Sequence, residues 1–106
     1  MSREDGAPPT FLVEHYWPGV TVEGFRDAAE RLRASSTELA ASNSEIRFLH
    51  STLVPEDEAA FCVFAASSPE IVVEAYRRAG VQFERILGAL EMSGPARNSE
   101  SGKERT

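Results

Sequence analysis

The chain has 106 residues, which is enough for one domain, and its 42% hydrophobic and 26% charged residues are typical of a folded globular protein. Its net charge is −6 and its eleven Lys and Arg residues form no basic stripe, which argues against a nucleic-acid-binding protein. No apolar segment is long enough to cross a membrane and no apolar leader is visible, so we expect a cytoplasmic protein.

The first half of the chain predicts a strand, a helix and a second strand. Residues 10–17 are rich in aromatic and β-favouring side chains and are followed by Pro and Gly, which predicts a strand that ends there. Apolar residues then recur at spacings of three, four and seven, which predicts a helix capped by Thr21 and ended near Asn43. Residues 45–54 predict the second strand.

The second half predicts a strand, a helix and a last strand. A charged, proline-containing turn over 55–58 precedes the apolar run of 59–66, whose length suits a third strand. Ser68, followed by Pro and Glu, is a strong start signal for a second helix, and Gly80 is its expected end. Residues 83–92 predict the fourth strand.

The order β-α-β-β-α-β predicts a ferredoxin-like α+β fold, with a four-stranded antiparallel sheet. Right-handed crossovers place both helices on one face of that sheet. The folded domain should span 10–92, between two disordered tails. The first, over 1–9, is polar and ends in proline, and the second, over 93–106, lacks large apolar side chains. The strands at 45–54 and 59–66 are apolar on both sides, yet no helix is left for the second face. We therefore expect a homodimer of the dimeric α+β barrel type.

Two histidines and one cysteine are the residues best suited to chemistry. Glycine-rich phosphate loops, nucleophile elbows and HExxH motifs are all absent. Strand alternation predicts that His50 shares a face with Phe48, but whether His15, His50 and Cys62 meet depends on the strand register. The lone Cys62 cannot form an intramolecular disulfide, and its apolar surroundings predict a buried thiol. Each histidine is open to three interpretations: a sheet residue with one hydrogen-bond partner, a metal ligand, or an acid–base group.

Five segments resemble a domain-of-unknown-function family that includes an actinobacterial nickel-binding protein. They are VEHYWPGVT (13–21), FLHS (48–51), FCVF (61–64), SPEI (68–71) and AGV (79–81). The distances between these segments match the family, and the similarity covers about residues 10–92. The resemblance implies a dimeric ferredoxin-like α+β fold.

The resemblance also implies a set of metal ligands, which this chain keeps in part. An acidic residue that the family carries three places after its cysteine is Ala65 here, and a histidine of the second helix corresponds to Tyr76, otherwise taken as a packing residue. The first residue of a histidine pair on the first strand is replaced by a carboxylate, a harder oxygen donor. The candidate metal ligands are therefore Glu14, His15, His50 and Cys62.

Three functions fit these residues. The first is a small binding protein that takes a divalent transition metal of the nickel type, or a small ligand, at a site containing histidine. The second is a non-catalytic member that acts through protein contacts. The third is a cofactor-poor enzyme of the monooxygenase or isomerase kind with His15 or His50 as general base. An apolar pocket of a few hundred Å³ with one histidine projecting into it would favour this function. We rank binding first and enzyme last.

Overall fold

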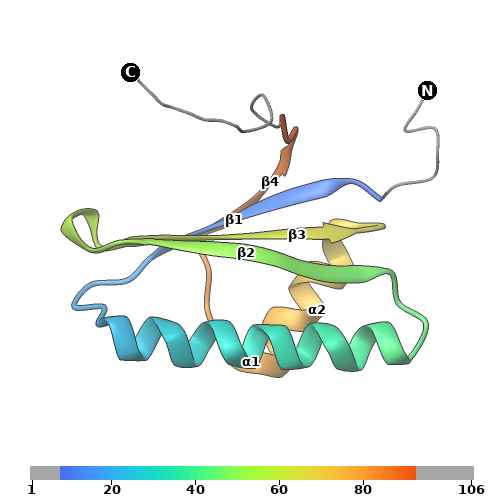
Figure 1. Cartoon of the computed structure of the whole chain (residues 1–106), viewed down its shortest axis with the longest axis horizontal. Coiled ribbons are helices and arrows are strands. Elements are labelled where there is room, and N and C mark those ends of the chain that lie inside the picture. The colour runs from blue at the N-terminus through green and yellow to red at the C-terminus, as the bar shows by residue number, and fades with distance from the viewer. Residues whose placement is uncertain (1–7, 93–106) are drawn as a thin grey trace, which may run out of the picture.

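The structure, a computed structural model, describes residues 8–92 (Figure 1). The predicted tails over 1–9 and 93–106 lie outside the described residues, apart from Pro8 and Pro9. Among residues 8–92, no helix has the length and hydrophobicity needed to cross a membrane. In chain order the elements are β1 (Thr10–Tyr16), α1 (Val22–Ala41), β2 (Ile46–Val54), the short 3-10 helix η1 (Pro55–Asp57), β3 (Ala59–Ala66), α2 (Pro69–Ala79) and β4 (Arg85–Ala89).

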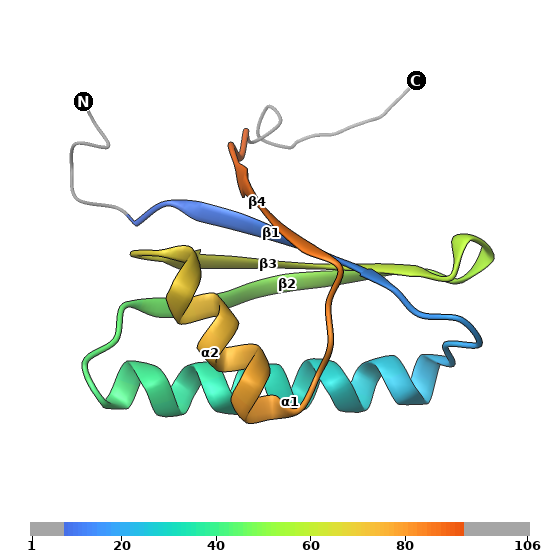
Figure 2. The same cartoon turned by 180° about the vertical axis from the view of Figure 1, so that it is seen from behind.

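The four strands form one antiparallel sheet in the order β2-β3-β1-β4. Both helices lie on the same side of this sheet, as Figures 1 and 2 show from opposite directions. The predicted ferredoxin-like fold is confirmed. We call the side that packs against the helices the helix face and the other side, which no described element covers, the open face.

The ends of the helices follow the local sequence signals. The hydroxyl of Thr21 accepts a hydrogen bond from the backbone N–H of Gly24 (2.9 Å), which caps α1. After α1 the chain turns at Asn43, with φ of 75°, and α2 ends at Gly80, with φ of 69°. Ser68 has the extended backbone of a cap residue, but its side chain makes no capping hydrogen bond.

The core lies between the helices and the helix face, and Tyr76 of α2 stands at its centre. The Tyr76 ring is 1% exposed and packs edge-on against Phe64 of β3 and Phe83, with centroid distances of 5.7 and 5.0 Å. β4 begins two residues later than the predicted strand over 83–92 and ends three residues earlier, because β1 pairs with it only from Glu14 opposite Arg85 to Thr10 opposite Ala89.

One extra residue in β2 decides which way His50 faces. Phe48 pairs with Phe64 on β3, whereas His50 pairs with the neighbouring Val63, so that a bulge separates them at Leu49. Neighbouring residues of β3 point to opposite faces. Phe48 therefore points to the helices and His50 to the open face, and the prediction that these two residues share a face is wrong. Simple alternation along a sequence cannot reveal an inserted residue.

Candidate functional site

His15 lies at the end of β1 on the helix face and is almost fully buried. Its Nδ1 lies 2.9 Å from the backbone oxygen of Ala60, and its Nε2 lies 2.8 Å from the hydroxyl of Tyr76. A carbonyl oxygen can only accept, so Nδ1 carries the proton and Nε2 accepts the hydrogen bond of the Tyr76 hydroxyl. Burial lowers the pKa of His15, and the bond to Ala60 offsets part of that effect. The ring is therefore a neutral imidazole whose two nitrogens are both occupied.

Cys62 of β3 adjoins the same hydroxyl and is fully buried. Burial raises the pKa of the Cys62 thiol to about 11, and its interaction with Tyr76 lowers it in part. Burial also raises the pKa of the Tyr76 hydroxyl, and the neighbouring Cys62 adds to the rise. The inner cluster of His15, Cys62 and Tyr76 is thus uncharged at neutral pH. The prediction that Cys62 is a buried thiol is confirmed.

The other two candidate metal ligands lie on the open face. Glu14 neighbours His15 in β1 but points the other way, and its Oε1 accepts from Nε of Arg85 on β4 at 2.7 Å. His50 of β2 is about half exposed, and its Nε2 is 4.0 Å from Oε2 of Glu91. The sheet therefore separates Glu14 and His50 from His15 and Cys62. Among residues 8–92, no three His, Cys, Asp or Glu side chains gather into a group that could hold a metal ion.

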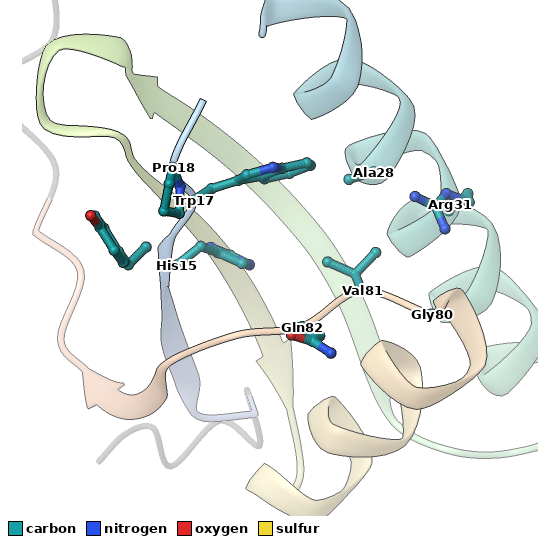
Figure 3. Close-up of a pocket in the computed structure, with 9 residues that line it drawn as sticks. His15, Trp17, Pro18, Ala28, Arg31, Gly80, Val81 and Gln82 are labelled. Atoms are coloured by element: carbon teal, nitrogen blue, oxygen red, sulfur yellow. The ribbon is translucent and has the colours of Figure 1, made fainter. Parts of the chain in front are cut away.

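A pocket of about 330 Å³ opens beside His15, between β1, α1 and the segment that follows α2 (Figure 3). His15 and Trp17 reach it from the β1 side, and Arg31 reaches it from α1. The volume falls within the range of natural small-molecule sites. The residues that line the pocket are His15, Tyr16, Trp17, Pro18, Ala28, Arg31, Gly80, Val81 and Gln82.

The loop that carries Trp17 into this pocket is held by Glu58. The backbone N–H of Trp17 donates to the Glu58 carbonyl oxygen (2.7 Å), and the N–H of Gly19 donates to the Glu58 carboxylate (2.9 Å). Glu58 itself has a left-handed backbone, with φ of 52°, at the end of η1. The turn before β3 therefore fixes the loop after β1, although 39 residues separate Gly19 from Glu58.

Arg31 is the one formally charged side chain among the residues that line the pocket. Its Nε donates to Oδ2 of Asp27 at 3.1 Å, one turn earlier in α1. Its Nη1 donates to the carbonyl oxygen of Ala79 at 2.8 Å, and so satisfies one of the free carbonyl groups at the end of α2. These two bonds fix the guanidinium at the junction of the two helices and leave other N–H groups for a ligand.

Comparison with known proteins assigns the chain to a family. The sequence profile of the family described as nickel responsive protein SCO4226-like matches residues 11–88. The chain belongs to this family. No curated protein matches the chain.

A solved structure supports the same fold. The crystal structure of SCO4226 from Streptomyces coelicolor A3(2) superposes with a TM-score of 0.68 at 19% sequence identity and covers 79% of this chain and 99% of its own. At that identity the similarity supports the fold and no individual site residue. For this SCO4226-like chain, the roles of single residues must come from its own geometry.

Sequence reasoning overlooked most of the pocket. Of the residues that line it, Trp17, Arg31 and Gln82 were not predicted as site residues. Tyr76, which bonds to His15 from the core, was predicted as a packing residue. The available signal for Tyr76 was its position four residues after Val72, on the apolar stripe of α2. No local signal points to Arg31, because its partner Ala79 is 48 residues away.

Proposed function

We propose that this protein is a binding protein and that the pocket beside His15 holds a small organic ligand. The observation that carries the proposal is a concave site lined by an aromatic ring, a guanidinium held at the junction of the two helices and an amide side chain. These groups belong to Trp17, Arg31 and Gln82. Apolar surface combined with a few placed polar groups is the usual composition of a ligand site.

The same geometry argues against an enzyme that uses His15 as a general base. A pocket of the required size is present, and His15 lines it. However, Nδ1 is occupied by Ala60 and Nε2 by Tyr76, so neither nitrogen is free to take a proton from a bound molecule. We therefore propose binding without catalysis.

Fragment screening by NMR tests the proposal. A set of neutral, acidic and basic molecules of about ten non-hydrogen atoms should shift the indole signal of Trp17 and the backbone signals of residues 80–82. Val81→Trp, which fills the pocket, should abolish these shifts, whereas Val73→Trp on the exposed side of α2 should not. Shifts that persist in Val81→Trp, or no fragment that moves these signals, would refute the pocket.

A divalent transition metal is the second candidate ligand, and the family description favours it. His15 meets one requirement of a metal ligand, because a backbone carbonyl fixes its Nδ1–H, but a metal would have to displace the Tyr76 hydroxyl from the lone pair on Nε2. Cys62 would be the second inner ligand, but its thiol would first have to lose a proton. Glu14 and His50 could contribute only from the open face. Within one described chain, these four residues therefore do not form a single metal site, whereas the pocket beside His15 is one continuous site for an organic ligand.

Calorimetric titration of untagged protein with Ni²⁺, Cu²⁺ and Zn²⁺ tests this second candidate. Loss of uptake in His15→Ala alone would assign the metal to the inner cluster, and loss in His50→Ala alone would assign it to the open face. Uptake through Cys62 should release a proton and strengthen as pH rises. Equal uptake by the wild type and the His15→Ala/His50→Ala double mutant would refute a metal site that uses either histidine.

We also propose that two copies pair through their open faces. On the open face, Leu12 of β1 lies between its partners Val63 of β3 and Leu87 of β4. Phe61 points to the same face two residues before Val63, and Leu90 just beyond β4 is 84% exposed. Apolar surface of this kind is rarely left bare on a monomer. Sedimentation at micromolar concentration should give a dimer for the wild type and a monomer for Phe61→Arg. A wild-type monomer would refute the pairing, and the cytoplasmic location stays a prediction.

A further inference from the structure

We propose that the ligand of the pocket beside His15 is a small organic carboxylate, which pairs with Arg31 and lies against Trp17. This inference rests on the proposed function and adds the chemical class of the ligand. Among the described residues, Arg31 supplies the one formal charge in the pocket wall, because burial lowers the pKa of His15 and keeps its ring neutral. A guanidinium recognises the planar, two-oxygen shape of a carboxylate particularly well.

The present partners of Arg31 leave it available to a ligand. Asp27 is exposed over 70% of its side chain and lies in the same helix, and ion pairs of this kind contribute little to stability. A ligand carboxylate can therefore replace or join Asp27 at small cost. The bond from Nη1 to the Ala79 oxygen persists in either state and keeps the guanidinium oriented. Such preorganisation lowers the entropic cost of binding.

Charge and donor groups favour a carboxylate over a phosphate. A phosphate carries more negative charge and is usually held by several cations or by successive backbone N–H groups. Here a single arginine faces the pocket, Asp27 offsets part of its charge, and the whole chain carries a net charge of −6. A singly charged anion is therefore the better match.

The remaining wall determines the size and shape of the ligand. Trp17, Pro18 and Val81 offer apolar surface, and the side-chain amide of Gln82 can donate or accept a hydrogen bond. A volume of about 330 Å³ lies at the lower end of the range of small-molecule sites. An aromatic acid of about ten non-hydrogen atoms suits a site of this size, with its ring against the indole of Trp17.

Titration followed by the fluorescence of Trp17, the single tryptophan of the chain, tests the inference. The probes are phenylacetate and phenylacetamide, which have similar shape but differ in charge, together with inorganic phosphate. Phenylacetate should bind with a Kd on the order of 1 mM, as expected of so small a molecule. Phenylacetamide and phosphate should bind at least tenfold more weakly.

Variants of Arg31 separate the charge from the pocket. Arg31→Gln should weaken phenylacetate binding at least tenfold, and Arg31→Lys, which keeps the charge but loses the fork geometry, should weaken it less. Arg26→Gln, at an exposed position on the same helix, should have no effect. If both probes bind equally and Arg31→Gln changes neither, the carboxylate is wrong while the pocket stands. If neither probe binds the wild type, the carboxylate is wrong, and fragment screening decides the pocket by itself.

Discussion

Replacing Tyr76 by Phe removes one oxygen atom from the core and leaves the ring in place. The oxygen lies 2.8 Å from Nε2 of His15, and both side chains are buried. In Tyr76→Phe the lone pair on Nε2 loses its hydrogen-bond partner while His15 is only 5% exposed, which costs about 1–3 kcal/mol of the free energy of unfolding. For a domain of this size, the expected fall in Tm is about 5–20 °C.

Urea unfolding, followed by Trp17 fluorescence and far-UV circular dichroism at one protein concentration, measures this loss. Tyr16→Phe is the matched control, because it removes the same atom from a side chain that is 60% exposed. Its free energy of unfolding should stay within about 0.5 kcal/mol of the wild type. If the two variants are equally stable, the hydroxyl of Tyr76 does not satisfy Nε2 of His15.

Three further predictions concern pH, backbone and thiol reactivity. Burial lowers the pKa of His15 in the folded state, so near pH 6.5 the unfolded chain takes up a proton on this ring and the folded chain does not. The free energy of unfolding should therefore fall as the pH drops from about 7 to 5, by at most about 1.4 kcal/mol per pH unit. The urea midpoint of His15→Gln should change less over this range, and an equally steep profile would contradict the burial of His15. Gly80→Ala should lower the free energy of unfolding by about 1 kcal/mol, because Gly80 has a left-handed φ. Gly88→Ala should not, because an added Cβ there meets no atom within 4 Å. Equal unfolding midpoints of the two variants would refute this prediction. Cys62 should resist an aromatic disulfide reagent at pH 8 until the protein unfolds, and rapid labelling of the native protein would show that the thiol is not buried.

The fold could be predicted because its signals are local. The cap at Thr21, the stop at Gly80 and the apolar run of β3 (Ala59–Ala66) each depend on a few neighbouring residues. Element order and the handedness of crossovers then leave few topologies. The boundaries of β4 were missed because they depend on its pairing with the distant β1, which runs only from Thr10 opposite Ala89 to Glu14 opposite Arg85.

The site could be predicted only in part, because its geometry is set by register and long-range packing. The sequence identified His15 and Cys62 as candidates, and the structure brings both to Tyr76. It could not place His50, whose face depends on a bulge. It also could not find Arg31, whose orientation depends on where the end of α2 arrives. Residue type indicates which side chains can do chemistry, but only the folded chain determines which of them meet.

The five residues between the end of α2 and the start of β4 are anchored at both of their ends. Gly80 ends the helix with its left-handed turn, and the N–H of Glu84 donates to the backbone oxygen of Glu14 at 2.7 Å. Val81 and Gln82, between these two anchors, form one wall of the pocket. An inserted or deleted residue here would displace Val81 and Gln82 from the pocket. The connection from α1 to β2, which contributes nothing to that wall, should tolerate such length changes. Relatives that share the pocket should therefore vary in length over 42–45 and keep the spacing over 80–84.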